Sequence, residues 1–479
     1  MGDVRGSMAI ESRSIDWVPD EERHGRVWHQ GALWFLGNFQ YFTVAVGFVG
    51  PSLGLPLAPT ILAGVLGIVV GTLFMAFHAS QGPVLGLPQM IQSRAQFGYR
   101  GVIAVLVATL FTYLGFNVAD QVLVSQGLHG VFGWDPTAVA IGCAVLAALL
   151  AVYGHDWLHR VFRWLLYVSL PLMLILTVGV LTGQAAGHLT GQQHHAFGWA
   201  AFFAQFSAAA AYNITYAPYV SDYSRYLPRT TSARSLIAAV FCGAAGSAIW
   251  LIALGGWLAT RLGASDGLVG LRQAGEHIMP GLGTATAVFS VLSLVATMGM
   301  NAYGGMLTVL TGVDSVRKIA PNPTTRAMTV LALAVLWYVI GSAVSQNAVT
   351  TVFTALTLML YLLVPWTATN LVDFFFVRRG HYSVADLFRP DGVYRVWAWR
   401  GLTAYGVGIA AEVPFMVLPD LGGGSYIGPL AHRLAGTDIA WLVGLAVTSA
   451  VYAVVCRSQD RTVEHAATRS SECQAPPVR

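Results

Sequence analysis

The sequence predicts an all-α integral membrane protein with 12 transmembrane helices, and both its composition and its apolar pattern support this class. Of its 479 residues, 55% are hydrophobic and 10% are charged, whereas about a quarter of the residues in a soluble protein are charged. The apolar stretches are numerous and long enough to cross the hydrocarbon core of a bilayer. We therefore expect the lipid bilayer as a partner and no nucleic acid, because the net charge of +4 reflects membrane topology.

Twelve apolar stretches define the predicted spans. They are expected at about 30–50, 58–79, 101–128, 137–154, 162–182, 199–220, 232–259, 283–310, 326–344, 348–373, 400–419 and 437–456. Two of them, 137–154 and 400–419, are near the short limit, which tilting and flanking residues accommodate. Asp373 is expected at the membrane interface, and the polar tail from Arg457 is expected to lack a fixed structure.

The basic residues are distributed unevenly between the two sides of this map. Of 26 Lys and Arg residues, only Arg261, Arg272 and Arg433 fall on the second side, and the other 23 fall on the side of the N-terminus. Cationic residues are retained in the cytoplasm. We therefore expect a multi-pass protein of the plasma membrane with both termini cytoplasmic and no cleavable signal peptide.

Two spans interrupt their apolar pattern with polar residues. The segment Phe206–Arg229, FSAAAAYNITYAPYVSDYSRYLPR, begins as a helix of small residues and then carries Tyr212, Asn213 and Pro218. Span 30–50 holds the sequence GNFQ at residues 37–40 near its middle. Backbone groups freed by a break need partners other than lipid, so broken helices at membrane depth usually line a binding site. For span 30–50, helix packing through small residues is the alternative explanation.

A polar stripe runs down span 101–128. Its members follow helical spacing: Tyr113, Phe116, Asn117, Asp120 and Gln121. A carboxylate is costly inside a bilayer, so Asp120 should face a cavity or a partner. A structural hydrogen bond between helices is the alternative role for this acid.

Span 283–310 carries Ser293, Thr297 and Asn301 four residues apart, which places two hydroxyls and an amide on one helix face. Hydroxyl and carbonyl oxygens suit a monovalent cation, and an amide suits a hydrogen-bonding ligand. The alternative for the hydroxyls is bonding back to the carbonyls of their own helix. Glu412 is a further acid inside a span, and the sequence assigns it no role.

The sequence offers little evidence for a metal site or for enzymatic catalysis. The four cysteines, Cys143, Cys242, Cys456 and Cys473, have no paired spacing that would indicate a disulfide framework or a zinc site. His155 and His159 have metal-ligand spacing but no third ligand nearby, and His194 and His195 are equally uninformative. We expect no metal beyond a sodium ion, no cofactor and no catalytic constellation.

Two motifs give the chain a family resemblance. GPVLGLPQMIQSRAQFGYRG, residues 82–101, closely resembles the signature loop of the nucleobase:cation symporter family, which includes the purine–cytosine permeases. APYVSDYSRYLPR, Ala217–Arg229, resembles the second signature of the same family, to which the cytosine permease and the hydantoin transporter are related. The two motifs occur in the family's order, on the side predicted to be cytoplasmic.

The resemblance implies a leucine-transporter-like fold and a transport function. A cytoplasmic tail of residues 1–29 would precede a core of two inverted five-helix repeats at 30–373. A loop and two additional helices at 374–456 and a cytoplasmic tail at 457–479 would follow. The implied protein imports a nucleobase or a related nitrogen heterocycle by cation symport with alternating access, with cytosine or a purine as the leading candidates. We expect it to be a monomer. The open alternatives are symport of allantoin, hydantoin, a pyrimidine vitamin precursor or an amino acid.

The resemblance also implies a substrate site on four spans. Phe116 falls where the family has a stacking aromatic residue, and Asp120 falls where it often has an amide. An acid there would only accept hydrogen bonds, which favours a substrate edge rich in N–H groups. The full implied set is Asn38, Gln40, Phe116, Asn117, Asp120, Tyr212, Asn213 and Asn301.

The coupling ion is left open between sodium and a proton. The family's sodium site uses carbonyls of the first span, here near Leu36 and Phe39, and two adjacent hydroxyl residues of the eighth span. Those two positions are Ala296 and Thr297, so one hydroxyl is missing, with Ser293 one turn away. Asp120 is the candidate for carrying a coupled proton.

Overall fold

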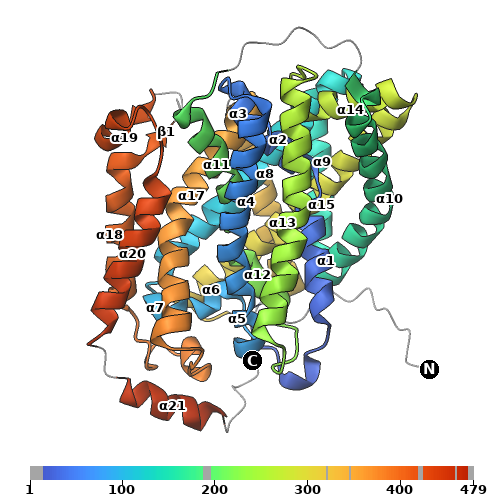
Figure 1. Cartoon of the computed structure of the whole chain (residues 1–479). Helices are drawn as coiled ribbons and strands as arrows, with labels where there is room; N and C mark the ends of the chain where they lie inside the picture. The colour runs from blue at the N-terminus through green and yellow to red at the C-terminus, as the bar shows by residue number, and fades with distance from the viewer. Residues whose placement is uncertain are drawn as a thin grey trace, which may run out of the picture.

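The computed structural model describes residues 15–186, 196–319, 322–344, 347–418, 424–458 and 461–472 as a helical bundle with one small ribbon (Figure 1). The ribbon pairs β1 (Val417–Leu418) antiparallel with β2 (Tyr426–Ile427). The helices are α1 Val27–Asn38, α2 Tyr41–Val46, α3 Val49–Ser52, α4 Leu57–Ala79, α5 Gln81–Leu85, α6 Gln89–Gln92, α7 Arg94–Phe97, α8 Ile103–Phe132, α9 Pro136–Tyr153, α10 His155–Leu181, α11 Trp199–Ile214, α12 Ala217–Ser224, α13 Ala233–Thr260, α14 Gly267–Ile278, α15 Leu282–Val316, α16 Pro323–Ala343, α17 Ala348–Val372, α18 Trp399–Glu412, α19 Pro429–Arg433, α20 Ala440–Cys456 and α21 Thr462–Glu472.

The long apolar helices confirm a multi-pass membrane architecture. Within the described residues, eight helices are long and apolar enough to cross a bilayer, and the bent pair formed by Val27–Asn38 and Tyr41–Ser52 adds a ninth candidate. The other three predicted spans correspond to α11 with α12, to α18 and to α20, which are broken or short. The two ends of the bundle are formed by different helices. Helices α5, α12 and α21 lie toward one end, and α14 and α19 lie at the other (Figure 1).

The signature loop is a packed structure, as its prolines and glycines predict. Its short helices α5, α6 and α7 are almost fully buried. The Gln89 backbone N–H donates to Asp222 Oδ1 at 2.9 Å, which ties the loop to α12. Arg94 forms a buried ion pair of 3.0 Å with Asp314 on α15. The loop, which follows α4, is therefore tied to both α12 and α15.

Asp373, which is expected at the membrane interface, is buried among protein side chains at the end of α17. Its carboxylate accepts hydrogen bonds from Gln96 at 2.5 Å and from the hydroxyls of Tyr382 and Tyr452 at 2.8 Å each, and it forms an ion pair with Arg378. A carboxylate with this many donors and a cation can be buried without a large desolvation penalty.

The C-terminal tail also differs from the expectation that it lacks a fixed structure. Residues 462–472 form α21, which lies across the end of the bundle (Figure 1). Glu464 on α21 accepts a hydrogen bond of 2.5 Å from Nε of Arg378, the cation that pairs with Asp373. Composition alone suggested disorder, and this ion pair supplies the docking contact that composition does not reveal.

The eleventh predicted span is shorter than the expected 400–419. Helix α18 ends at Glu412, and a helical turn with Pro414 and then β1 follow, because proline cannot continue the ladder of helix hydrogen bonds. The Glu412 side chain is buried beside Gly444 of α20, and neither carboxylate oxygen has a hydrogen-bond partner in the described part of the chain.

Glycines let the broken first span lie directly against α13. A Cβ added at Gly255 would lie 2.0 Å from the Val44 carbonyl oxygen, and one added at Gly243 would lie 2.1 Å from the Gly31 carbonyl oxygen. Close backbone approach through small residues is the usual way in which helices associate inside a membrane. Here it fixes both halves of the broken span on one long straight helix.

Gly255→Ala is expected to destabilise the folded protein by about 1–3 kcal/mol, because its methyl group would collide with the Val44 backbone. Gly246→Ala is the matched control, since Gly246 is on the same helix and has open space around it. Thermal unfolding of the purified variants in detergent measures the difference. Equal melting temperatures for the two variants would contradict this packing account.

Candidate functional site

The first helix break separates α1 from α2 and bends the span by 61°. Gln40 is extended, with φ −153° and ψ 173°, and its side-chain oxygen accepts the Phe42 N–H at 2.5 Å. The Thr43 hydroxyl donates to the Asn38 carbonyl at 2.5 Å. Side chains of the break therefore satisfy backbone groups that lipid could not.

The second break lies between α11 and α12, at Thr215 and Tyr216. The Thr215 hydroxyl donates to the Ala211 carbonyl at 2.7 Å. Pro218 stands in the first turn of α12, where its missing N–H costs nothing. The predicted irregularity of this segment is confirmed, and it places Tyr212 and Asn213 on the last turn of α11.

The two breaks meet through their polar side chains. The Asn38 amide donates to Asn213 Oδ1 at 2.7 Å, and the Gln40 amide donates to the Tyr212 hydroxyl at 2.8 Å. Thr43 Oγ1 lies 2.7 Å from the same Tyr212 hydroxyl. Four of the predicted substrate residues thus form one hydrogen-bonded group across two spans.

The other polar residues of the predicted set form a second group between α8 and α15. The Asn301 amide donates to Asn117 Oδ1 at 2.9 Å and to Asp120 Oδ2 at 3.4 Å, and Asn301 Oδ1 accepts from the Tyr219 hydroxyl at 2.9 Å. Asp120 Oδ1 is buried and has no hydrogen-bond donor among the described residues. A buried acceptor without a donor is costly, so it is a candidate ligand contact.

Aromatic rings connect the two polar groups. Phe116 stacks on Tyr216 with 5.6 Å between ring centroids and 13° between planes. Its ring also meets Phe42 edge-to-face at 5.5 Å and Tyr212 at 6.4 Å. Offset and edge-to-face pairs are the favoured arrangements of aromatic rings. Phe116, predicted as a stacking residue, therefore lies among rings.

We call these residues the central cluster: Asn38, Gln40, Phe42, Thr43, Phe116, Asn117, Asp120, Tyr212, Asn213, Tyr216, Tyr219 and Asn301. Each is at most 2% exposed. The cluster combines flat apolar faces with directed amide, hydroxyl and carboxylate groups. Such a combination can hold a flat heterocycle and recognise the donors and acceptors on its edge.

The predicted cation residues of α15 bond mainly to their own helix. The Ser293 hydroxyl donates to the Phe289 carbonyl at 2.9 Å, and the Thr297 hydroxyl donates to the Ser293 carbonyl at 3.1 Å. Ser293 Oγ also lies 3.4 Å from Ser169 Oγ on α10. Hydroxyls that donate in this way keep lone pairs available for a cation.

The predicted carbonyls of the first span lie at its break. The Leu36 carbonyl accepts the Phe39 N–H at 3.0 Å, and the Phe39 ring stacks on Phe35 with centroids 5.3 Å apart. Ala296 is fully buried on α15. Among the described residues, no hydrogen bond joins Leu36 or Phe39 to Ser293 or Thr297.

Several contacting residues were not predicted from the sequence as site members. Thr72 on α4 accepts the Asn213 amide at 2.6 Å, and Ser169 approaches Ser293. Each is a single polar residue in a span without periodicity, so no pattern marked it. Tyr216 and Tyr219 had a signal, because both belong to the irregular tyrosine-rich segment that spans the break between α11 and α12 and the start of α12.

No metal centre is apparent in the part of the chain that the structure describes, where no group of three His, Cys, Asp or Glu side chains could hold an ion. His155 and His159 open α10, but their side chains are outside the described set. His194 and His195 also lie outside the described residues.

Comparison with known proteins gives matches over most of the chain. Residues 17–444 match a family described as permeases for cytosine/purines, uracil, thiamine and allantoin. The chain is 33% identical over 455 residues to YxlA of Bacillus subtilis, described provisionally as a purine-cytosine permease, covering 94% of this chain and 96% of that protein. It is 25% identical over 471 residues to the purine-cytosine permease fcyB of Emericella nidulans, covering 94% and 89%.

A solved structure shows the same fold. It is that of Mhp1, described as a nucleobase-cation-symport-1 family transporter in a closed conformation with bromovinylhydantoin bound. The TM-score is 0.73 at 17% identity, and the match covers 98% of this chain and 100% of Mhp1.

Asn38→Asp is expected to destabilise the protein by about 3 kcal/mol, because it replaces an amide donor by a carboxylate facing Asn213 Oδ1 and the Ala244 carbonyl. Asn322→Asp is the matched control, since Asn322 caps α16 at an exposed position where aspartate caps equally well. Thermal unfolding with size-exclusion chromatography compares the two. A fully stable Asn38→Asp variant would contradict the proposed role of this amide.

Proposed function

We propose that this chain, which belongs to the family of permeases for cytosine and purines, uracil, thiamine and allantoin, imports cytosine or a purine by cation symport with alternating access. Its resemblance to the nucleobase:cation symporter family is confirmed by the family match and by the permease relatives. The chain is a membrane transporter of the nucleobase type, not an enzyme.

The observation that carries the substrate proposal is the unpartnered acceptor of Asp120 beside Asn301. Nucleobases are flat, neutral and edged with N–H donors and ring acceptors. Asp120 would accept from an N–H, and the Asn301 amide could both donate and accept. The ring faces of Phe116 and Tyr216 would supply stacking, with the base replacing one of their present ring contacts.

We propose an arrangement of 12 spans with two inverted five-helix repeats at residues 30–373 and two additional helices, acting as a monomer. The positions of the helix breaks support the repeats, because the broken pairs α1–α2 and α11–α12 each begin one half of that core. The charge asymmetry supports cytoplasmic termini in the plasma membrane. Arg272 and Arg433 belong to α14 and α19, at the end opposite α12 and α21 (Figure 1).

One structural observation supports sodium as the coupling ion, and another supports a proton. Ser169, 3.4 Å from Ser293, could supply an oxygen where Ala296 has none. A cation stripped of water inside a membrane needs such oxygens. Asp120 supports the proton, because no Lys or Arg of the described residues pairs with this buried acid.

The substrate proposal is tested by competition. Uptake of labelled cytosine in cells that express the protein should be reduced by unlabelled cytosine and hypoxanthine more than by uracil, allantoin or hydantoin. Strong inhibition by allantoin or hydantoin alone would redirect the proposal to those heterocycles. Inhibition by an amino acid alone would contradict a nucleobase site.

Phe116→Ala is expected to weaken substrate binding by at least about 0.5–1.5 kcal/mol, the contribution of an aromatic contact beyond its buried area. Phe116→Trp should retain most of the affinity, because it keeps a ring face. Binding of the labelled base to purified protein measures both.

Phe206→Ala is the matched control for that pair. Phe206 stacks on Trp441 at 5.7 Å and 29°, a geometry close to that of Phe116 on Tyr216, but its partner is on α20. The control should lose stability and keep its affinity for the base. Equal affinity losses in Phe116→Ala, Phe116→Trp and Phe206→Ala would indicate general packing instead of stacking on the substrate.

The coupling ion is resolved in proteoliposomes with independently clamped sodium and pH gradients. If sodium couples, a sodium gradient alone drives accumulation, and Thr297→Ala shifts the half-saturating sodium concentration upward about tenfold, the effect of losing about 1.4 kcal/mol of binding. If Asp120 carries a proton, a pH gradient alone drives accumulation, and Asp120→Asn retains exchange without accumulation.

Thr286→Ala is the control for Thr297→Ala, because Thr286 is equally buried on α15 and its hydroxyl bonds back to Leu282 in the same manner. It should leave the sodium dependence unchanged. Accumulation under a sodium gradient alone, undiminished in Asp120→Asn, would eliminate the proton mechanism. An identical sodium dependence in Thr297→Ala and Thr286→Ala would remove Thr297 from the cation site.

A further inference from the structure

Tyr219 stands in the first turn of α12, directly after the second helix break, and is only 1% exposed. Its ring meets two other tyrosines edge-to-face, with centroids 4.5 Å from Tyr113 and 5.1 Å from Tyr216. Edge-to-face packing on two sides restricts the ring and holds its hydroxyl in one place. That hydroxyl donates to Asn301 Oδ1 at 2.9 Å, which joins α12 to α15.

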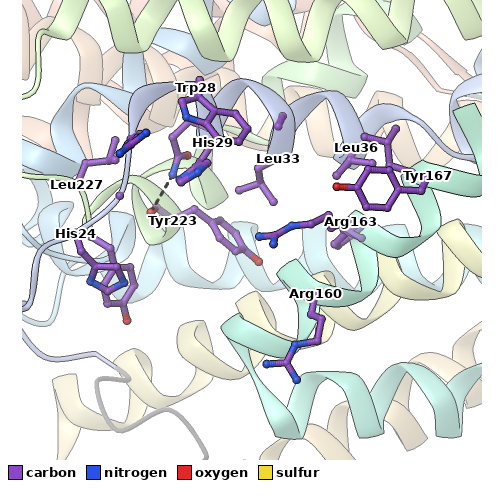
Figure 2. A pocket seen from close by; sticks show the side chains of 17 residues that line it. His24, Trp28, His29, Leu33, Leu36, Arg160, Arg163, Tyr167, Tyr223 and Leu227 are labelled. Carbon is purple, nitrogen blue, oxygen red and sulfur yellow. Dashed lines mark hydrogen bonds between the residues drawn. The ribbon is translucent and has the colours of Figure 1, made fainter. Parts of the chain in front are cut away.

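Tyr223, one helical turn further along α12, has a different environment. It lines a cavity of about 620 Å³ between α1, α10 and the end of α12, and Tyr219 is not among the described residues that line it (Figure 2). The Tyr219 hydroxyl is therefore shielded from solvent that enters this cavity. A hydrogen bond in a shielded, low-dielectric interior is stronger than one in water, so the bond from Tyr219 can fix the side chain of Asn301.

The Asn301 amide has its two ends committed to different neighbours. Its Oδ1 accepts from Tyr219, whereas its Nδ2 donates to Asn117 Oδ1 at 2.9 Å and to Asp120 Oδ2 at 3.4 Å. Asn117 is itself oriented, because its Nδ2 donates to the Met298 carbonyl at 3.2 Å. A rotated Asn301 amide would bring Oδ1 against the acceptors of Asn117 and Asp120. The hydroxyl donor on one side and these acceptors on the other therefore select one orientation.

This orientation decides which group Asn301 offers next to Asp120. The N–H that reaches Asp120 Oδ2 does so at 3.4 Å, beyond the usual range of an N–H···O bond, so it is weakly engaged. The other oxygen, Asp120 Oδ1, is a buried acceptor without a donor among the described residues. One donor and one acceptor thus stand side by side. The complementary ligand edge carries an acceptor next to an N–H donor, as do the ring nitrogen and amino group of cytosine or adenine.

We infer that Tyr219 is a positioning residue that sets the specificity of the site through Asn301. Its hydroxyl occupies the Asn301 carbonyl and keeps the amide N–H directed toward an acceptor of the ligand. The inference rests on the proposed transport of a nucleobase, because it assigns the edge by which that base is recognised. Without the hydroxyl, Asn301 Oδ1 is a buried acceptor that lacks a donor, which is costly. The amide then gains by turning this oxygen toward an amino group of the ligand, and a ligand acceptor is no longer required.

The test measures the binding of two matched ligand pairs to the purified full-length wild type, Tyr219→Phe and Tyr113→Phe by isothermal titration calorimetry. In each pair, a C–H group replaces the ring nitrogen acceptor: cytosine is paired with 3-deazacytosine, and adenine with 1-deazaadenine. The readout is the ratio of the two dissociation constants within each pair. Tyr113→Phe is the matched control, because Tyr113 is 2% exposed and packs on the Tyr219 ring. In the described part of the chain, no hydrogen bond joins its hydroxyl to Asn301.

The wild type and Tyr113→Phe are expected to bind at least one base about tenfold more tightly than its analogue, because the analogue leaves the Asn301 N–H without an acceptor. In Tyr219→Phe this ratio should fall about threefold or more, the effect of one hydrogen bond of ordinary strength. A general loss of packing would weaken both ligands of a pair in parallel and leave the ratio unchanged.

The outcomes separate this inference from the proposed function. An unchanged ratio in Tyr219→Phe, or an equal fall in Tyr113→Phe, overturns the role of Tyr219 and leaves nucleobase transport intact, since the bases still bind. A wild type that binds each base and its analogue equally overturns the role of Tyr219 as well. Binding of neither base to the wild type, together with failed competition in the uptake assay, overturns the proposed function and this inference with it.

Discussion

The hydrogen bond between Asn38 and Asn213 joins the two interrupted helices of the bundle, and the central cluster depends on it. A helix that breaks inside a membrane exposes backbone groups that lipid cannot satisfy. Here each break is stabilised partly by its own side chains, such as Gln40 and Thr215, and partly by the other break. The polar groups that make the breaks tolerable are thus also the groups available to a ligand.

Next to the two breaks, neighbouring helices pack with their backbones close together. Glycines such as Gly255 let the first span lie directly on α13, and Gly71 on α4 brings α11 equally close, with an added Cβ 2.2 Å from the Ala210 carbonyl. The signature loop connects the halves at one end through the buried pair of Arg94 and Asp314.

Sequence reasoning selected candidate site residues where polar residues repeat at helical spacing. Asn117, Asp120 and Asn301 could be placed on inward faces because their spacing follows the helix period. Thr72 and Ser169 could not, since each is one polar residue whose meaning depends on a distant partner. The buried position of Asp373 and the docked helix α21 were missed for the same reason. Both depend on partners distant in sequence: Gln96 and Tyr452 for Asp373, and Arg378 for Glu464 of α21.

The central claim is that a flat heterocycle binds within the central cluster, between the two breaks. The most direct measurement is an electron cryo-microscopy structure of the full-length protein with cytosine bound. The account predicts a planar ligand against Phe116 or Tyr216, with its edge in hydrogen-bond contact with Asp120 and Asn301. A ligand bound elsewhere, with the contacts among Asp120, Asn117 and Asn301 unchanged, would contradict it.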